Sequence, residues 1–170
     1  MVTFAYLSTV EPPVKDGKPI CKQVVPDESL YIRYAPILAD YSRGMQDEKQ
    51  KEEIKRQIAG WSALTKNIMI WDYNVNYNDY LWYLPNLSYL KQNMLTYKQM
   101  GARYIMKQGA NNVSPIWHDD LHAYVCSKLF WDTDADVDKL VKEYVSLYFG
   151  AGAEKVQSYL DEMENLYGEL

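Results

Sequence analysis

The feature that most constrains the fold of this chain is a short apolar run, Ile68–Trp71, which stops at the carboxylate of Asp72 between two aromatic rings. Apolar runs of four to eight residues between polar flanks are typical of strands buried in a parallel sheet. Weaker runs of the same kind occur at Thr3–Tyr6, Leu30–Tyr34 and Arg103–Met106. Because ligands of α/β folds bind at the carboxyl ends of such strands, Asp72 is predicted to lie at a ligand site.

Helical patterns separate most of these strands. Apolar residues recur at three-to-four spacing, which predicts helices over about 47–64, 85–100, 117–131, 135–149 and 151–167. The connection between the first two strands, at 2–8 and 30–35, has no clear helical pattern. Strands that alternate with helices predict βαβ units and a parallel sheet.

Four such units match half of a (β/α)8 barrel. A complete barrel needs about 200 residues or more, and this chain has 170. We therefore expect an α/β fold that is a partial (β/α)8-type barrel, with about four parallel strands, covering helices and a helical carboxyl-terminal segment. Residues 1–170 are predicted to form a single domain, the carboxyl-terminal half of a larger barrel, although an open sheet is the alternative.

The charge and hydropathy patterns exclude several classes of partner. The formal net charge is -5 and the sequence pI is about 5.0, so the basic footprint of a nucleic-acid-binding protein is absent. No stretch approaches the roughly 18 consecutive apolar residues of a membrane span. The start, Met1-Val2-Thr3-Phe4, carries neither the basic nor the apolar part of an export signal.

No motif for a metal or a cofactor is convincing. His118-Asp119-Asp120-Leu121-His122 has two histidines on one helical face, but the glutamate of the zinc helix is replaced and no third ligand follows. We interpret it as the first turn of a helix, where acids favour the positive end of the dipole. Cys21 and Cys126 lack metal-type spacing and are expected to be free thiols. No cofactor is predicted, because phosphate-binding loops, nucleophile elbows and dinucleotide motifs are also missing.

The aromatic residues indicate a different ligand. The chain has 16 Tyr and 5 Trp against 3 Phe, and rings with a polar group suit surfaces that are half apolar and half wet. Sugar-binding clefts are surfaces of this kind, although tyrosines also fill the interfaces between layers. The loop at 74–83 is rich in Asn, Tyr and Trp, so Tyr73, Asn74 and Trp82 are candidate substrate contacts. The alternative is a loop that turns through its Asn residues and buries its rings.

The strand ends supply the other candidate residues. Asp72 is the candidate catalytic residue, yet glycoside hydrolysis needs two carboxylates, and Glu11 follows the first strand only after several residues. Arg33 has a planar fork that suits the carboxylate of a uronic acid, or else it forms an ion pair with an acid such as Asp72. Tyr34 and Gln108 are expected to orient a bound substrate.

Several segments resemble a bacterial domain family of unknown function. They are Thr3-Phe4-Ala5-Tyr6 with Pro12-Pro13, Tyr31–Pro36, Ile70-Trp71-Asp72-Tyr73 with Asn76-Tyr77, Leu84-Pro85-Asn86-Leu87, Gln108-Gly109, and Leu129-Phe130-Trp131-Asp132 to Tyr148-Phe149-Gly150. That family is similar to the barrel domain of α-glucuronidases and related glycoside hydrolases. The resemblance implies the carboxyl-terminal half of a (β/α)8-type domain, from secreted, periplasmic or surface-attached proteins that degrade polysaccharides. It also implies an active-face position for Asp72.

Three functions stay open on the sequence alone. The chain is a glycoside-hydrolase-like fragment that acts on acidic polysaccharide, a non-catalytic carbohydrate-binding module, or a structural fragment. Carbohydrate is the expected partner in the first two, and the isolated chain is expected to be inactive. In the third, the exposed edges of the sheet would lead to self-association.

Overall fold

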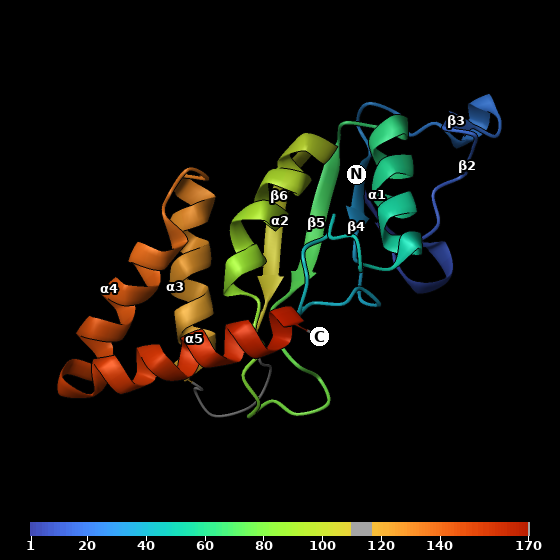
Figure 1. Cartoon of the computed structure of the whole chain (residues 1–170). Helices are drawn as coiled ribbons and strands as arrows, with labels where there is room; N and C mark the ends of the chain where they lie inside the picture. The colour runs from blue at the N-terminus through green and yellow to red at the C-terminus, as the bar shows by residue number, and fades with distance from the viewer. Residues whose placement is uncertain (110–116, 170) are drawn as a thin grey trace. The chain divides into compact units, whose positions relative to one another are not determined.

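The computed structural model describes residues 1–109 and 117–169, with only the backbone of 167–169 (Figure 1). The chain divides into two compact units, residues 1–73 with 95–108 and residues 74–94 with 109–170. The strands are β1 (Val2–Ala5), β2 (Val14–Lys15), β3 (Lys18–Pro19), β4 (Tyr31–Tyr34), β5 (Ile68–Tyr73) and β6 (Ala102–Gln108). The α-helices are α1 (Glu52–Leu64), α2 (Leu87–Met100), α3 (Trp117–Trp131), α4 (Val137–Phe149) and α5 (Ala153–Glu169), and the 3-10 turns are η1 (Leu7–Thr9), η2 (Lys22–Val24) and η3 (Gly150–Gly152).

The first unit is built on a four-stranded parallel sheet. Its strand order is β1-β4-β5-β6, so the strands follow one another in the sheet as they do in the sequence. A sheet that always steps in the same direction is the arrangement found in a segment of a (β/α)8 barrel. The predicted α/β fold with four parallel strands, covering helices and a carboxyl-terminal helix is thus confirmed.

The connection from β1 to β4 explains the irregular pattern in the sequence. It holds η1, the antiparallel hairpin of β2 and β3, and η2, with no α-helix between them. Strands β1 and β6 are the two edges of the sheet. Self-association through these edges stays a prediction, as does the expectation that the chain is one domain and half of a barrel.

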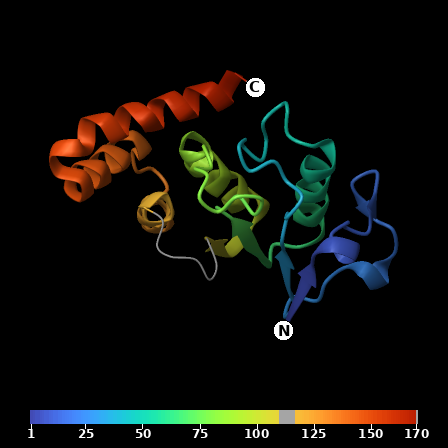
Figure 2. The ribbon, with the colours of Figure 1, turned by 90° about the horizontal axis from the view of Figure 1, so that it is seen from below.

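One face of the sheet carries the core of this unit. Because successive side chains of a strand point to opposite faces, Ile68 and Ile70 of β5 share a face with Ile32 and Tyr34 of β4. Figure 2 shows α1 and α2 on the same side of the strands. The core cluster comprises Ala5, Ile32, Tyr34, Met45, Ile54, Ile58, Trp61, Leu64, Ile68, Ile70, Tyr97 and Met100.

The opposite face, here named the open face, is partly exposed. Its members follow from strand alternation and are Val2, Phe4, Tyr31, Arg33, Met69, Trp71, Tyr73, Tyr104, Met106 and Gln108. Phe4 is 46% exposed, Tyr104 58% and Met106 41%. Parallel sheets are usually covered on both faces, so a face of exposed apolar side chains in the described part of the chain requires an explanation.

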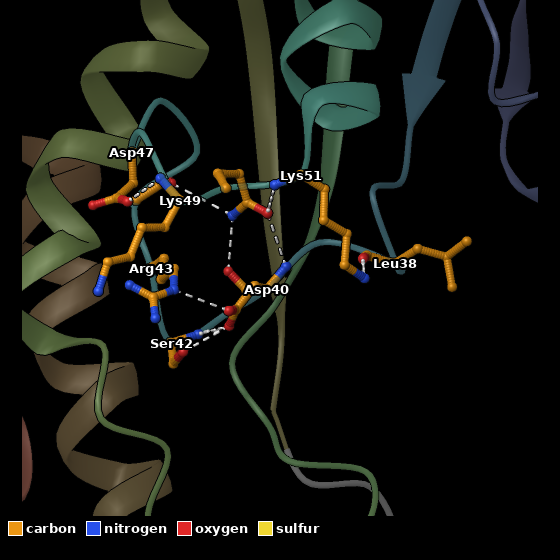
Figure 3. A network of polar contacts seen from close by, with 9 residues as sticks. Leu38, Asp40, Ser42, Arg43, Asp47, Lys49 and Lys51 are labelled. Atoms are coloured by element: carbon orange, nitrogen blue, oxygen red, sulfur yellow. Dashed lines mark hydrogen bonds and ion pairs between the residues drawn. The ribbon is translucent and has the colours of Figure 1, made fainter. Parts of the chain in front are cut away.

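The loop between β4 and α1 is held by hydrogen bonds of the Gln50 and Asp40 side chains (Figure 3). The side chain of Gln50 accepts hydrogen bonds from the backbone N–H of Asp40 at 3.1 Å and of Lys51 at 3.0 Å, and it donates to the Asp40 carbonyl at 2.9 Å. The Asp40 carboxylate accepts from Ser42 N at 3.0 Å, Ser42 Oγ at 2.6 Å and Arg43 Nε at 3.2 Å. These bonds hold the loop at the carboxyl end of β4 in one conformation.

Helix α1 begins later than the sequence pattern predicts. The helix was expected from Asp47, but it starts at Glu52. The Asp47 carboxylate accepts a hydrogen bond from Lys49 N at 2.8 Å, which stabilises a turn in place of the first helical residues. Short polar side chains compete with helix formation in this way.

The second unit has a charged anchor at the start of α2. The Glu164 carboxylate of α5 accepts hydrogen bonds from Tyr83 Oη at 2.6 Å, Leu87 N at 3.1 Å, Ser88 N at 3.2 Å and Ser88 Oγ at 2.8 Å. The first N–H groups of a helix have no partner within it, so a carboxylate placed here satisfies them and complements the helix dipole.

A glycine in α1 provides a test of the packing in the first unit. A Cβ on Gly60 would lie 3.0 Å from both Pro12 Cβ and Val14 Cγ2. Alanine favours a helix over glycine by about 1 kcal/mol, whereas overpacking costs about 1 to 3 kcal/mol. We predict that Gly60→Ala lowers the free energy of unfolding in urea, despite its better helix propensity. The exposed Ala59→Gly calibrates the propensity in the same helix, and a Gly60→Ala variant more stable than the parent would contradict this packing.

Candidate functional site

The centre of the open face is a cation between two rings. The Arg33 guanidinium carbon lies 5.1 Å from the ring centroid of Phe4 and 5.9 Å from that of Trp71, and the two rings are 5.8 Å apart. Phe4 lies directly opposite Arg33 in the pairing of β1 with β4. The three side chains therefore come from three adjacent strands, and the electron-rich ring faces attract the cation.

Polar and aromatic groups extend this centre along the sheet. Trp71 Nε1 donates a hydrogen bond to Gln108 Oε1 at 2.8 Å, which orients the Gln108 amide at the carboxyl end of β6. The rings of Tyr31 and Tyr104 meet edge to face with centroids 5.9 Å apart. The open face thus combines a fixed positive charge, ring surfaces and an amide.

Arg33 has no acidic partner among the residues that the structure describes. Its contacts there are the two rings. The alternative prediction that Arg33 pairs with Asp72 is wrong, because Asp72 forms its ion pair with Lys107, at 2.7 Å. The physical reason is strand alternation: Asp72 shares the helix-covered face with Ile70, whereas Arg33 lies on the open face.

Asp72 is fully buried in the covered layer. Its side chain is 0% exposed and that of Lys107 is 7% exposed, and the two residues lie directly opposite each other on β5 and β6. Burial, and then the negative charge of Asp72, raise the pKa values of Tyr41 and Tyr97, which keeps both hydroxyls protonated. The sequence predicts this carboxylate at a ligand site, whereas the structure buries it against Lys107. The catalytic role of Asp72 stays a prediction.

The remaining predicted site residues lie in different surroundings. Tyr34 is buried in the covered layer and donates its hydroxyl to Gln57 Oε1 at 3.0 Å. Tyr73 is buried, and its ring lies 5.6 Å from that of Tyr41. In the second unit, Asn74 is buried with its Nδ2 3.4 Å from Cys126 Sγ, and Trp82 is half exposed. Among these predicted residues, Arg33, Tyr73 and Gln108 occupy open-face positions of their strands, and Tyr73, at the end of β5, is buried against Tyr41.

The two histidines have structural partners in the second unit. His122 Nδ1 lies 2.7 Å from the His118 carbonyl, which can only accept, so this nitrogen carries a proton. His122 Nε2 lies 2.7 Å from the side chain of Asn86. Burial lowers the pKa of His118, against the opposing effect of Asp119. The predicted helix start is confirmed, since α3 begins at Trp117.

Further observations concern metals, thiols and membranes. Within residues 1–109 and 117–169 no group of three or more His, Cys, Asp or Glu side chains is arranged to hold a metal ion. Neither Cys21, which is exposed, nor Cys126, which is buried, forms a disulfide with a described residue. The described helices are all too short or too polar to traverse a bilayer.

Sequence reasoning missed most of the ring surface. Phe4, Tyr31, Tyr104 and Met106 were not predicted as site residues, although they occupy alternate positions of the predicted strands. The signal was available, because residues two apart on a strand share a face, and Arg33 marks which face that is.

The comparison with known proteins gives a family. Residues 1–161 match the family described as a domain of unknown function, DUF4838. The chain belongs to this family. No curated protein and no solved structure matches it. The prediction that the chain belongs to a domain family of unknown function is confirmed. The similarity of that family to the barrel domain of α-glucuronidases stays a prediction.

The buried ion pair of the DUF4838 domain makes a clear energetic prediction. Lys107→Met leaves the Asp72 carboxylate buried and unpaired, which should cost about 3 to 5 kcal/mol of unfolding free energy. The double variant Asp72→Leu with Lys107→Met removes both charges and should recover most of that loss. Urea unfolding measures both effects, with the exposed Lys49→Met as the control. Equal losses in the single and double variants would show that the two charges are not coupled.

Proposed function

We propose that this DUF4838 domain binds acidic carbohydrate through the open face of its parallel sheet. The observation that supports the proposal is the unpaired position of Arg33 between Phe4 and Trp71, on a face that is partly exposed. A cation that has ring contacts but no described acidic partner is ready to accept an anionic ligand.

The chemistry of the face suits a uronic acid residue. A guanidinium group presents two parallel N–H donors that match a carboxylate, and such charge-assisted pairs are stronger than neutral hydrogen bonds. The rings of Phe4, Trp71 and Tyr104 offer apolar surfaces for the C–H faces of a pyranose. The amide of Gln108 can bond a sugar hydroxyl, since its oxygen is already oriented by Trp71.

The geometry favours binding over catalysis in this chain. Glycoside hydrolysis uses two carboxylates that flank the scissile bond, and the one strong sequence candidate, Asp72, is fully buried and paired with Lys107. We therefore assign the chain a non-catalytic carbohydrate-binding role, within a glycoside-hydrolase-like parent that processes polysaccharide. Such a parent would work outside the cell or at its surface, where polysaccharides are found.

Binding to acidic oligosaccharides tests the role of Arg33. We expect the chain to bind uronic-acid oligosaccharides more tightly than neutral ones of equal length, measured by calorimetry and by the change in tryptophan fluorescence. Arg33→Ala should weaken acidic binding by about 10-fold or more, since a hydrogen bond to a charged group is worth about 1.5 to 3 kcal/mol. Arg33→Lys should recover part of the affinity because it keeps the charge but not the fork.

The matched control is Arg103→Ala. Arg103 is exposed on β6 of the same sheet, at a bulge where it has no opposite residue on β5. The Arg103→Ala variant removes one positive charge from the same sheet and leaves the contacts of Arg33 with Phe4 and Trp71 unchanged. If Arg33→Ala and Arg103→Ala weaken acidic binding equally, the loss comes from the change in net charge and not from Arg33 itself. The absence of any preference for acidic ligands would refute the proposal.

The catalytic prediction for Asp72 has a separate test. In a longer polypeptide that contains this domain and turns over an acidic glycan, Asp72→Asn should change kcat and the unfolding free energy together if Asp72 only supports the fold. A loss of kcat by several orders of magnitude with unchanged stability would instead place Asp72 in the reaction. Steady-state kinetics and urea unfolding of the same variant distinguish these results.

A further inference from the structure

A separate hollow lies at the carboxyl ends of β1 and β4. Its volume is about 280 Å³, which is at the small end of ligand pockets and suits a single small molecule. One wall is apolar and comes from Leu7, Val10 and the segment Ala35–Leu38. The other wall is polar and comes from Glu11 together with Glu53, Arg56 and Gln57 of α1.

The polar wall contains an ion pair whose side chains are 52% exposed at Glu11 and 61% exposed at Arg56. Glu11 Oε1 accepts hydrogen bonds from Arg56 Nη2 at 2.9 Å and from Gln57 Nε2 at 2.7 Å. Gln57 is itself buried and is held by the hydroxyl of Tyr34 at 3.0 Å. Burial pushes the pKa of Glu11 upward, but the bonds from Gln57 and Arg56 and the charge of Arg56 outweigh it, so the pKa is lowered.

The pair keeps groups available for a ligand. No described residue bonds Glu11 Oε2, and the second terminal nitrogen of Arg56 likewise has no described hydrogen-bond partner. The same ion pair therefore offers a carboxylate oxygen that can accept and a guanidinium N–H that can donate. Two neighbouring hydroxyl groups can satisfy both, because each hydroxyl can donate or accept.

Side chains of the β4–α1 loop donate hydrogen bonds to backbone carbonyls of the apolar wall. Tyr41 donates its hydroxyl to the Pro36 carbonyl at 2.7 Å. Lys51 Nζ donates to the Leu38 carbonyl, as Figure 3 shows. Leu38 is exposed, so this hydrogen bond holds the backbone of an apolar residue whose side chain does not belong to the core.

A strained residue contributes to the same wall. Leu7 has a φ of 47°, in the left-handed region that leucine rarely adopts, and its side chain is 56% exposed. Backbone strain of this kind persists where surrounding structure imposes it, and it is enriched at ligand sites. Here it places an exposed leucine against the hollow in place of the buried position that leucine normally takes.

We infer that this hollow is a second binding site, specific for one neutral monosaccharide unit whose vicinal hydroxyls bridge Glu11 and Arg56. The apolar wall of Leu7 and Leu38 packs against the C–H face of the sugar. With Glu53 included, the polar wall carries two negative charges and one positive charge, so a ligand carboxylate is disfavoured. The inference goes beyond the proposed role of the open face, because it uses different residues and the opposite charge preference.

The test is an NMR titration of the ¹⁵N-labelled chain with glucose, xylose, glucuronate and the amino acid leucine. We expect saturable shifts for a neutral sugar at the amides of Leu7, Ile37 and Leu38 and at the Gln57 side chain. Glu11→Ala should weaken this binding by about 10-fold or more, as the loss of a charged hydrogen bond implies. Leu7→Gly relieves the strained backbone, so it should fold at least as well as the parent and still bind the sugar more weakly.

Two control variants separate this site from the open face. Glu48→Gln removes an exposed charge in the β4–α1 loop outside the hollow and should leave binding unchanged, as should Arg33→Ala. Neutral-sugar binding that is lost in Arg33→Ala but kept in Glu11→Ala would overturn the inference. So would the absence of saturable shifts with every neutral sugar, or tighter binding of leucine or glucuronate at the hollow. Failure of the acidic ligands on the open face alone would refute only the proposed function.

Discussion

The alternation of side chains along β5 is the constraint on which the first unit depends. Ile68 and Ile70 point toward α1 and α2 and enter the core, whereas Met69 and Trp71 point to the open face. A shift of the strand by one residue would exchange the two sets, exposing isoleucines and burying Trp71 against the helices. The same constraint sends Asp72 to the covered side, one residue after the tryptophan that contacts Arg33. The register of one strand therefore determines both what is buried and which face can bind a ligand.

The buried ion pair at the end of β5 is better understood as a device for register than as a source of stability. Moving two charges out of water costs several kcal/mol each, and their attraction often does no more than offset that cost. Asp72 and Lys107 lie opposite each other across β5 and β6, toward the carboxyl ends of the two strands, beyond the bulge where Arg103 has no partner. A slipped register would leave each charge buried alone, at a high energetic cost. The pair thus penalises wrong pairings of an edge strand whose ladder contains a bulge.

The sequence predicted the order of strands and helices well, because hydrophobic periodicity reports which residues are buried. It predicted the environment of Asp72 poorly, since a strand end has two faces and the pattern Ile-Trp-Asp-Tyr contains apolar residues on both. Arg33 and Gln108 were predicted from their places at the polar ends of apolar runs, and both lie on the open face, while their role in binding stays a prediction. Lys107 was missed as the partner of Asp72 because cross-strand pairing depends on register, which a bulge in β6 displaces by one residue. In the hollow, Glu11 bonds Arg56 and Gln57, which lie 45 and 46 positions further along the sequence, so no local pattern reveals the site.

The two proposed sites differ because charge is balanced differently on each. On the open face a single cation lies on rings, which stabilise it without neutralising its charge, so a ligand anion is still attracted. In the hollow the cation is already paired with a carboxylate, so the remaining attraction is for groups that both donate and accept. Polysaccharides that carry acidic residues on neutral chains present both kinds of group. A domain with one site of each kind binds the acidic residue and a neutral sugar at separate places. Its preference then depends on the order of acidic and neutral sugars in the polymer rather than on the overall charge of the polymer.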